Sequence, residues 1–112
     1  MSNPILEIHD ARFHSVIRED AKLEVAAKGF EFIEGPNWHP RAHHLTFSDI
    51  IGDTIYRRHA DGGVITVRKP SHMANGNTYD RQGRILTCEH ATSRLTRSAA
   101  EGGGVEVLAS HY

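Results

Sequence analysis

Residue types that can bind a metal ion fall at the starts of short predicted strands. Glu34 immediately precedes Gly35-Pro36, where a predicted inner strand begins, so its carboxylate can point toward the inner edge of a sheet. Carboxylate oxygens suit hard divalent cations, and Ca²⁺ takes about six to eight oxygen ligands. Such a cation would polarise a carbonyl group and stabilise the negative charge that develops when water attacks it. One carboxylate cannot hold the ion alone, so a solvated turn residue is the alternative interpretation of Glu34.

Three further polar residues are candidates for substrate contacts. Asn75 precedes a second predicted inner strand, where it either faces the same inner space or only forms a turn. Glu89 and His90 end another strand, where they either line that space or form hydrogen bonds between sheets. A carboxylate could also serve as the general base for attack by water. The sequence singles out no residue for that role, so the catalytic residues are unassigned.

Other reactive residue types have structural interpretations. Ser71-His72 lacks both a partner acid and the Gly-x-Ser-x-Gly elbow of a serine nucleophile. Residues 102–104 lack the Lys and Ser/Thr of a phosphate-binding loop and are interpreted as a hairpin turn. Cys88 lies within an apolar strand and is expected to be a buried, inert thiol. Three histidines beside Pro40 are interpreted as residues of a surface turn: His39, His43 and His44.

The composition limits the class of protein. The chain has 112 residues, enough for one ordinary domain at most. Its 13 basic and 14 acidic residues nearly cancel, which argues against an electrostatic nucleic-acid binder. No apolar run approaches the roughly 18 residues that cross a bilayer, and the first twelve residues contain no apolar signal region. A single cysteine excludes an internal disulfide, so we expect a cytoplasmic protein without membrane or nucleic-acid partners.

A gapless internal repeat organises the chain. Residues 45–63 align with residues 85–103 at an offset of 40, and the short apolar runs and the turn residues coincide. The runs are rich in β-branched and aromatic residues and are separated by Gly and Asp, a pattern typical of short strands joined by turns. Aromatic residues at strand positions, Trp38, Phe47 and Tyr56, are expected to pack against the sheets. The predicted strands are 36–38, 45–48, 54–58, 64–67, 76–79, 85–88, 94–97 and 105–108.

Four short strands in each unit of 40 residues are typical of a β-propeller blade. Because one four-stranded sheet cannot bury both of its faces, blades stack around a central axis. The sequence predicts an all-β chain with one blade over residues 31–69 and a second over 72–110. Residues 22–28 match the outermost strand of a blade, and we expect them to complete the last blade of a closed ring. A plain β-sandwich or meander is the alternative.

Two segments carry a resemblance to a known family. The first, residues 29–40, contains Glu34-Gly35-Pro36 before Asn37-Trp38. The second, residues 71–90, contains Ala74-Asn75-Gly76 and ends in Cys88-Glu89-His90. Together they resemble the bacterial gluconolactonase branch of the SMP-30/gluconolactonase family, over about residues 13–112. The resemblance implies a six-bladed propeller, of which residues 1–112 would be a single N-terminal fragment with two blades and one unpaired outer strand.

The resemblance also implies an activity and a cofactor. Members of the family are lactone hydrolases, a class of carboxylic ester hydrolase, that use one divalent metal, commonly Ca²⁺, in the central channel. It implies that Glu34 is a metal ligand and that an asparagine and an aspartate from later blades complete the site. We therefore expect a sugar lactone as the small-molecule substrate. We also expect this chain to need the missing blades, or self-association, for activity.

A non-enzymatic binding or assembly module is the alternative function. Two blades in each chain would let three copies close a six-bladed ring as a homotrimer, burying blade faces that a monomer leaves exposed. An isolated monomer is expected to be weakly folded, because its sheet edges stay unpaired and a chain of this size has little core.

Overall fold

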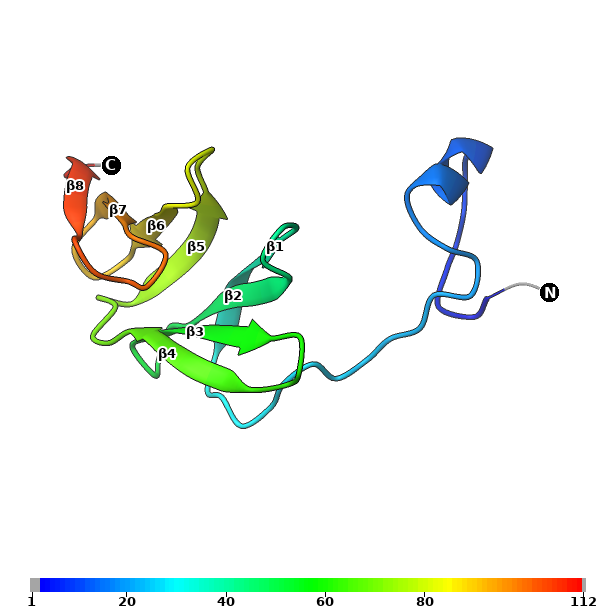
Figure 1. Cartoon of the computed structure of the whole chain (residues 1–112), viewed down its shortest axis with the longest axis horizontal. Coiled ribbons are helices and arrows are strands. Elements are labelled where there is room, and N and C mark those ends of the chain that lie inside the picture. Colours follow the sequence, from blue (N-terminus) through cyan, green and yellow to red (C-terminus); the bar gives the residue numbers. More distant parts are fainter. Residues whose placement is uncertain (1–2, 112) are drawn as a thin grey trace.

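A computed structural model describes residues 3–111, and these form two four-stranded antiparallel sheets and one short 3₁₀ helix, η1 (Ala11–Ser15). Each sheet is a meander in which consecutive strands pair (Figure 1). The strands of the first sheet are β1 (Ile33–His39), β2 (His44–Asp49), β3 (Thr54–His59) and β4 (Val64–Arg68). Those of the second sheet are β5 (Ala74–Tyr79), β6 (Ile85–Glu89), β7 (Arg94–Ser98) and β8 (Glu106–Ala109).

The structure confirms the all-β class and every one of the strands predicted within the repeat. The last strand begins at Glu106, one residue later than predicted. The repeat also extends to the turns, where positions 40 residues apart have a positive φ. Matched pairs of this kind are His43 with Gly83, Asp53 with Ser93, and Gly62 with Gly102. The two sheets are therefore two copies of one structural unit, which fall within the predicted ranges 31–69 and 72–110. The predicted fragment also includes residues 1, 2 and 112, which lie outside the described residues.

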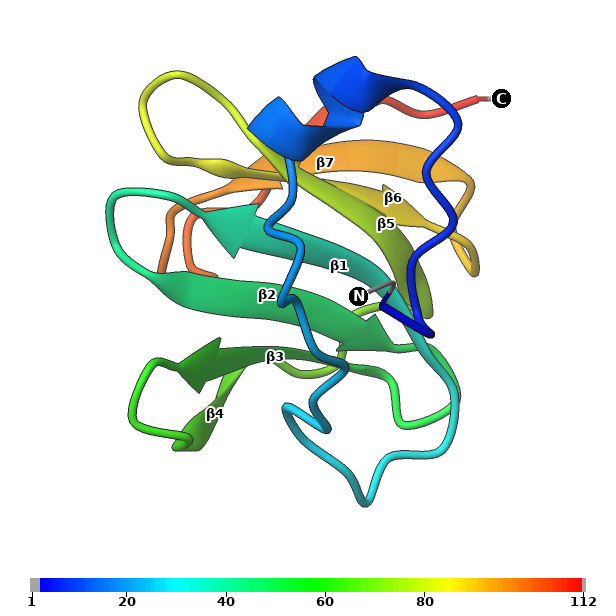
Figure 2. The ribbon, with the colours of Figure 1, turned by 90° about the vertical axis from the view of Figure 1, so that its right-hand side faces the viewer.

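The two sheets pack against each other through their inner strands. Strands β1 and β5 lie side by side, and β2 also contacts β5 (Figure 2). Among the described residues the buried apolar side chains are few: Phe47, Ile55, Ala74 and Ile85. Small polar side chains fill much of the remaining interior, among them Ser48, Ser71 and the threonines 46, 54, 87 and 96. Because buried hydroxyl groups need hydrogen-bond partners, the contact between the sheets is specified by hydrogen bonds as well as by apolar packing.

Two glycines allow the sheets to approach each other. A Cβ atom at Gly35, which has a φ of 60°, would lie 1.9 Å from the carbonyl oxygen of Asn75. A Cβ atom at Gly102, with a φ of 91°, would lie 2.0 Å from the carbonyl oxygen of Val67. Each glycine belongs to one sheet and faces the backbone of the other. The absence of a side chain at these two positions thus sets the spacing of the sheets.

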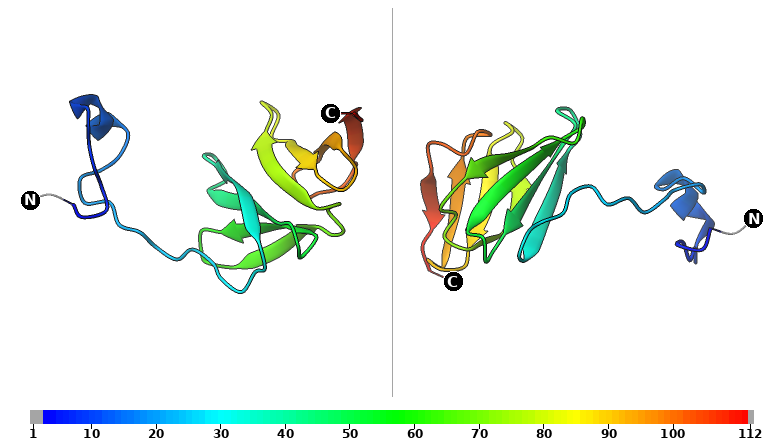
Figure 3. Two further views of the ribbon diagram at one scale, coloured as in Figure 1. Left: turned by 180° about the vertical axis from the view of Figure 1, so that it is seen from behind. Right: turned by 90° about the horizontal axis from the view of Figure 1, so that it is seen from below.

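The closing strand expected at residues 22–28 stays a prediction, because the last blade that it would complete is not among the described residues. These residues are extended but are not paired in a ladder with any described strand. A strand requires a second strand for its backbone hydrogen bonds, and here only isolated contacts occur, such as Arg58 Nε donating to the carbonyl of Ala26 at 3.1 Å. The segment leads from the sheets to η1, which stands apart from them in both views of Figure 3. Within the described residues no helix is both long enough and apolar enough to cross a bilayer.

Three predictions about individual side chains are wrong. Cys88 is exposed, although its repeat partner Ser48 is buried. The reason is that Ser48 faces β5, whereas no described strand packs on the corresponding face of the second sheet. Trp38 is half exposed for the same reason, because it pairs with Leu45 on the face of the first sheet turned away from the second. His44 is buried between the sheets, so only His43 is the exposed turn residue that was predicted.

Candidate functional site

Both inner strands are interrupted at the same place in the repeat. The register between β1 and β2 shifts between Glu34 and Asn37, and that between β5 and β6 shifts between Ala74 and Asn77. These irregularities fall at matched positions, 40 residues apart. Extra residues in one strand of a pair bend that strand and redirect its side chains, and such bulges are frequent beside active sites. The two irregularities identify the edge where β1 meets β5 as the candidate site.

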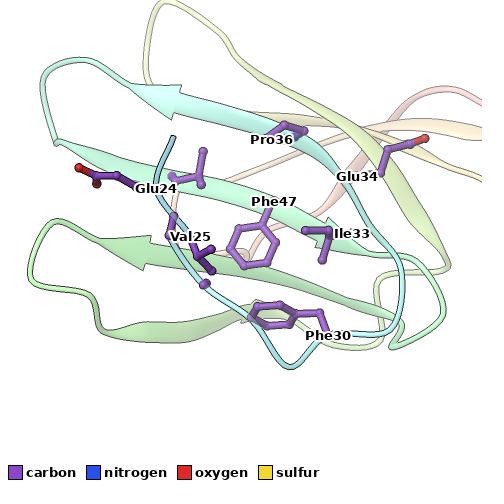
Figure 4. A pocket seen from close by; sticks show the side chains of 10 residues that line it. Glu24, Val25, Phe30, Ile33, Glu34, Pro36 and Phe47 are labelled. Atoms are coloured by element: carbon purple, nitrogen blue, oxygen red, sulfur yellow. The ribbon is translucent and has the colours of Figure 1, made fainter. Parts of the chain in front are cut away.

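Glu34 lies at the first of these irregularities. It pairs with Ser48, whose side chain faces β5, so the Glu34 side chain lies on the face of the first sheet that meets the second. Its carboxylate points away from the apolar side chains of Phe30, Ile33 and Phe47 (Figure 4). Glu34 is exposed, and within residues 3–111 no hydrogen bond or ion pair engages its carboxylate. The carboxylate is therefore available as an oxygen ligand.

Asn75 lies directly across from the residue that follows Glu34. The close approach of Gly35 to the carbonyl oxygen of Asn75 places the two bulged segments in backbone contact. Asn75 is half-buried, and its side-chain oxygen accepts a hydrogen bond from the backbone N–H of Gly76 at 2.5 Å. An amide oxygen has two lone pairs, so this bond leaves capacity for a second partner. The structure thus brings together Glu34 and Asn75, which are 41 residues apart in the sequence.

Asn77 links the two segments, and sequence analysis missed it. Its side-chain nitrogen lies 3.2 Å from the carbonyl oxygen of Gly35, 3.2 Å from that of Asn75 and 2.7 Å from the hydroxyl of Ser48. Its side-chain oxygen accepts a hydrogen bond from the hydroxyl of Thr87 at 2.9 Å. The repeat held a signal, because Asn37 occupies the matched position.

Comparison with known proteins now decides the family. The sequence profile of the SMP-30/gluconolactonase/LRE-like region matches residues 32–112, which is most of the chain and contains both sheets. This chain belongs to the SMP-30/gluconolactonase/LRE-like family. No curated protein sequence matches it significantly.

Two solved structures agree with this assignment. A gluconolactonase from Xanthomonas campestris is 32% identical, with a TM-score of 0.68 over 74% of this chain. An X-ray structure of a protein provisionally described as a gluconolactonase is 30% identical, with a TM-score of 0.76 over 90% of this chain. The family member described here spans 28% and 35% of the lengths of these two proteins. Its two sheets are blades of a β-propeller, as the repeat predicts.

Glu89 in this family member joins the two blades. It is fully buried, and its carboxylate lies 3.2 Å from Arg68 of the first blade and 2.8 Å from Arg94 of its own blade. Burial raises the pKa of the Glu89 carboxyl. Hydrogen bonds from Arg94 and Thr92, together with the nearby charge of Arg68, outweigh burial and hold that pKa below its usual value. Of the two roles considered for Glu89, the geometry favours the bond between sheets over a substrate contact.

His90 follows Glu89 in an exposed turn. Its backbone N–H donates to the carbonyl of Met73 at 3.2 Å, which connects the turn to the loop between the blades. Ser71 in that loop is fully buried, and its hydroxyl lies 3.4 Å from the Asp53 carboxylate and accepts from the N–H of Ala74 at 3.2 Å. Ser71 therefore has a structural role in this loop.

The donor set of the site fits part of a calcium site. No group of three or more His, Cys, Asp or Glu side chains in residues 3–111 is arranged to hold a metal ion. Glu34 and Asn75 offer oxygen atoms, the donor type that Ca²⁺ and Mg²⁺ prefer. Their number is too small for complete coordination. These residues are therefore of a type that a hard cation can bind, and they could not hold one alone.

An apolar pocket lies on the opposite face of the first blade. It has a volume of about 330 Å³ and lies between the N-terminal segment and β1 and β2 (Figure 4). Its lining includes Val25, Phe30, Ile33, Pro36 and Phe47. Glu34 also borders this pocket, but its carboxylate points away from these apolar side chains (Figure 4), and we assign the pocket no substrate.

Proposed function

We propose that this chain supplies the first part of the active site of a lactone hydrolase. In this proposal Glu34 is one ligand of a divalent cation, Ca²⁺ by preference, and Asn75 contacts the substrate, a sugar lactone. The observation that supports it best is the exposed Glu34 carboxylate, without a partner in residues 3–111, at a bulge where two propeller blades meet. A carboxylate at such a position can bind a cation without first breaking an ion pair.

The reaction is the addition of water to the acyl carbon of the lactone. The bond between that carbon and the ring oxygen breaks, the ring oxygen receives a proton, and a hydroxy acid is released. When bound, the cation supplies Lewis acidity at the lactone carbonyl. The Glu34 carboxylate lies near the start of β1, where it offers oxygen atoms to the cation. The Asn75 amide has N–H groups that can donate to a carbonyl or hydroxyl oxygen of the substrate. Full coordination requires further oxygen donors, which additional blades or other copies of the chain would supply.

A lactone-opening assay with a matched pair of variants tests this proposal. The acid released from a sugar lactone is titrated at constant pH, with Ca²⁺ and with a chelator. We expect Glu34→Gln to lower kcat/KM or Ca²⁺ affinity by about a hundredfold, because one ligand loses its charge. Glu31→Gln changes an exposed carboxylate three residues away and should stay within about twofold of the native value. Hydrolysis that neither chelation nor Glu34→Gln reduces would contradict the proposal.

A second candidate function is assembly, favoured by the exposed outer face of the second blade. Cys88 is exposed there, on a face that no described strand covers. In this alternative, three copies close a ring and bury these faces. Light scattering distinguishes the two states, since a monodisperse monomer at all concentrations would rule out the homotrimer.

A further inference from the structure

The side chain of Asn77 has an unusual set of partners for a residue of a propeller strand. Its two N–H groups face three oxygens, those of Gly35, Asn75 and Ser48, and its oxygen is bound by Thr87. An asparagine amide offers two donors and one acceptor oxygen, so its hydrogen-bonding capacity is used almost fully. Such a side chain is held in one orientation by both blades.

Two of these partners are the backbone carbonyls that bound the candidate site. Gly35 follows Glu34, and Asn75 is itself a candidate, so one amide nitrogen at 3.2 Å from each carbonyl ties the two bulged segments together. Without the Asn77 amide, the contact between the two segments would be unfavourable, because the carbonyl oxygens of Gly35 and Asn75 would face each other without a donor between them. The amide of Asn77 supplies that donor.

The repeat provides an internal comparison. Asn37 occupies the matched position in the first blade. In the part of the chain that the structure describes, no hydrogen bond of the Asn37 side chain bridges the blades. Asn37 pairs with Thr46 on the face of the first sheet that meets β5, whereas Asn77 pairs with Thr87. Asparagine at this position is therefore compatible with the inner strand in both contexts, and the bridging contacts belong to the junction between the two blades.

We infer that Asn77 is a positioning residue that sets the separation of Glu34 and Asn75 by bridging the backbones of the two bulges. That Glu34 and Asn75 form a functional site rests on the proposed function. The bridge between the two backbones can be tested without measuring activity. Asn77→Asp keeps the size of the side chain and replaces its donors by a second acceptor. It should therefore push the carbonyls of Gly35 and Asn75 apart while the strands stay paired.

The experiment compares variants of the whole chain by two measurements. Nuclear Overhauser effects between Gly35 Hα and the backbone protons of Asn75 and Gly76 report the contact. Titration with Tb³⁺, a luminescent hard cation, reports the binding of oxygen ligands. We expect Asn77→Asp to remove the contact and to weaken Tb³⁺ binding by about tenfold or more. The control Asn37→Asp should keep the contact and stay within about twofold in affinity.

Thr87→Val covers the case in which Asn77→Asp does not fold. It removes only the hydroxyl that orients the Asn77 oxygen, and it should weaken the contact and the Tb³⁺ affinity to a smaller extent. If the Gly35–Asn75 contact stayed intact in both Asn77→Asp and Thr87→Val, the inference would be overturned. It would also be overturned if Asn37→Asp lost the contact to the same extent as Asn77→Asp. Failure of the native chain and of Glu34→Gln to bind Tb³⁺ would count against the proposed function alone, since the contact measurement still decides the role of Asn77.

Discussion

At the scale of single residues, the junction between the blades is rich in polar groups that contact one another. His44 and Thr46 both contact the hydroxyl of Tyr79, and Arg57 donates to the carbonyl of Ala100. Buried polar groups of this kind stabilise a structure only while every partner is present. We therefore expect substitutions that remove one partner to be more damaging than their modest size suggests.

The buried Glu89 gives the clearest residue-scale prediction. Glu89→Gln removes the negative charge that faces Arg68 and Arg94 while nearly preserving shape. Removal of one partner from a buried ion pair leaves uncompensated charge, so the free energy of unfolding should fall by about 3 kcal/mol. Urea unfolding followed by circular dichroism measures this difference. Glu101→Gln, in an exposed turn, is the control and should change stability by less than about 0.5 kcal/mol.

Stability should also depend on pH through His44. Burial, followed by the charge of Arg57 and the neighbouring rings of His39 and His59, lowers the pKa of His44 to about 4. A histidine that is free in the unfolded chain binds its proton near pH 6.5. The unfolded state therefore binds more protons between pH 6.5 and 4, so stability falls as the pH is lowered through that range.

The expected loss is about 3 kcal/mol between pH 7 and pH 4, from one histidine. Equilibrium unfolding at a series of pH values measures it. Replacement of His44 by Gln should flatten the curve between pH 6.5 and 4, whereas His90→Gln, in an exposed turn, should leave it unchanged. Asp49 and Glu89 have lowered pKa values, so their contributions are lost only at lower pH, below the usual carboxyl range. An unchanged slope in the His44 variant would contradict this assignment.

At the scale of the elements, the bulges and the glycines decide how two similar sheets fit together. Gly35 and Gly76 both belong to bulged inner strands, but only Gly35 faces the backbone of the other blade. A matched pair of substitutions can therefore separate the effect of blade contact from the effect of glycine in a strand.

We predict that Gly35→Ala destabilises the chain by about 3 kcal/mol, because its Cβ would overlap the Asn75 carbonyl and its φ is positive. Gly76→Ala should be tolerated within about 1 kcal/mol, since a Cβ atom there meets nothing within 4 Å. Thermal unfolding of both variants under one set of conditions measures the difference. Equal destabilisation by the two substitutions would show that the blade contact is not the cause.

At the scale of the whole molecule, each blade buries one face against the other and leaves the second face uncovered. On the first blade, the face turned away from the second blade is partly covered by the aromatic side chains of Phe30, Phe47 and Tyr56. Their ring centroids are 5.0–5.7 Å apart. The uncovered face of the second blade carries Cys88. A propeller normally covers such faces with neighbouring blades.

The thiol of Cys88 therefore reports whether this face is covered. In the monomer it should react with a thiol reagent under native conditions at nearly the rate seen in urea, because it is exposed. Self-association through this face would slow the reaction as the protein concentration rises. Ser48→Cys provides the comparison, since the side chain at this matched position is buried against β5 and should react only after unfolding.

The strands, the turns and the repeat of 40 residues could all be predicted from the sequence, because they depend on local periodicity and on turn residues. The role of Glu34 as a metal ligand, which the family resemblance implies, stays a prediction. The roles of Asn77, Gly35 and Arg68 were not predicted, since each depends on contacts with residues of the other sheet. The exposure of Cys88 and the burial of His44 also depend on which residues of the other sheet lie nearby, so the sequence did not predict them. A repeat predicts the same strand twice, but only the tertiary structure decides which copy of a face is covered, because burial is a property of neighbours rather than of the sequence position.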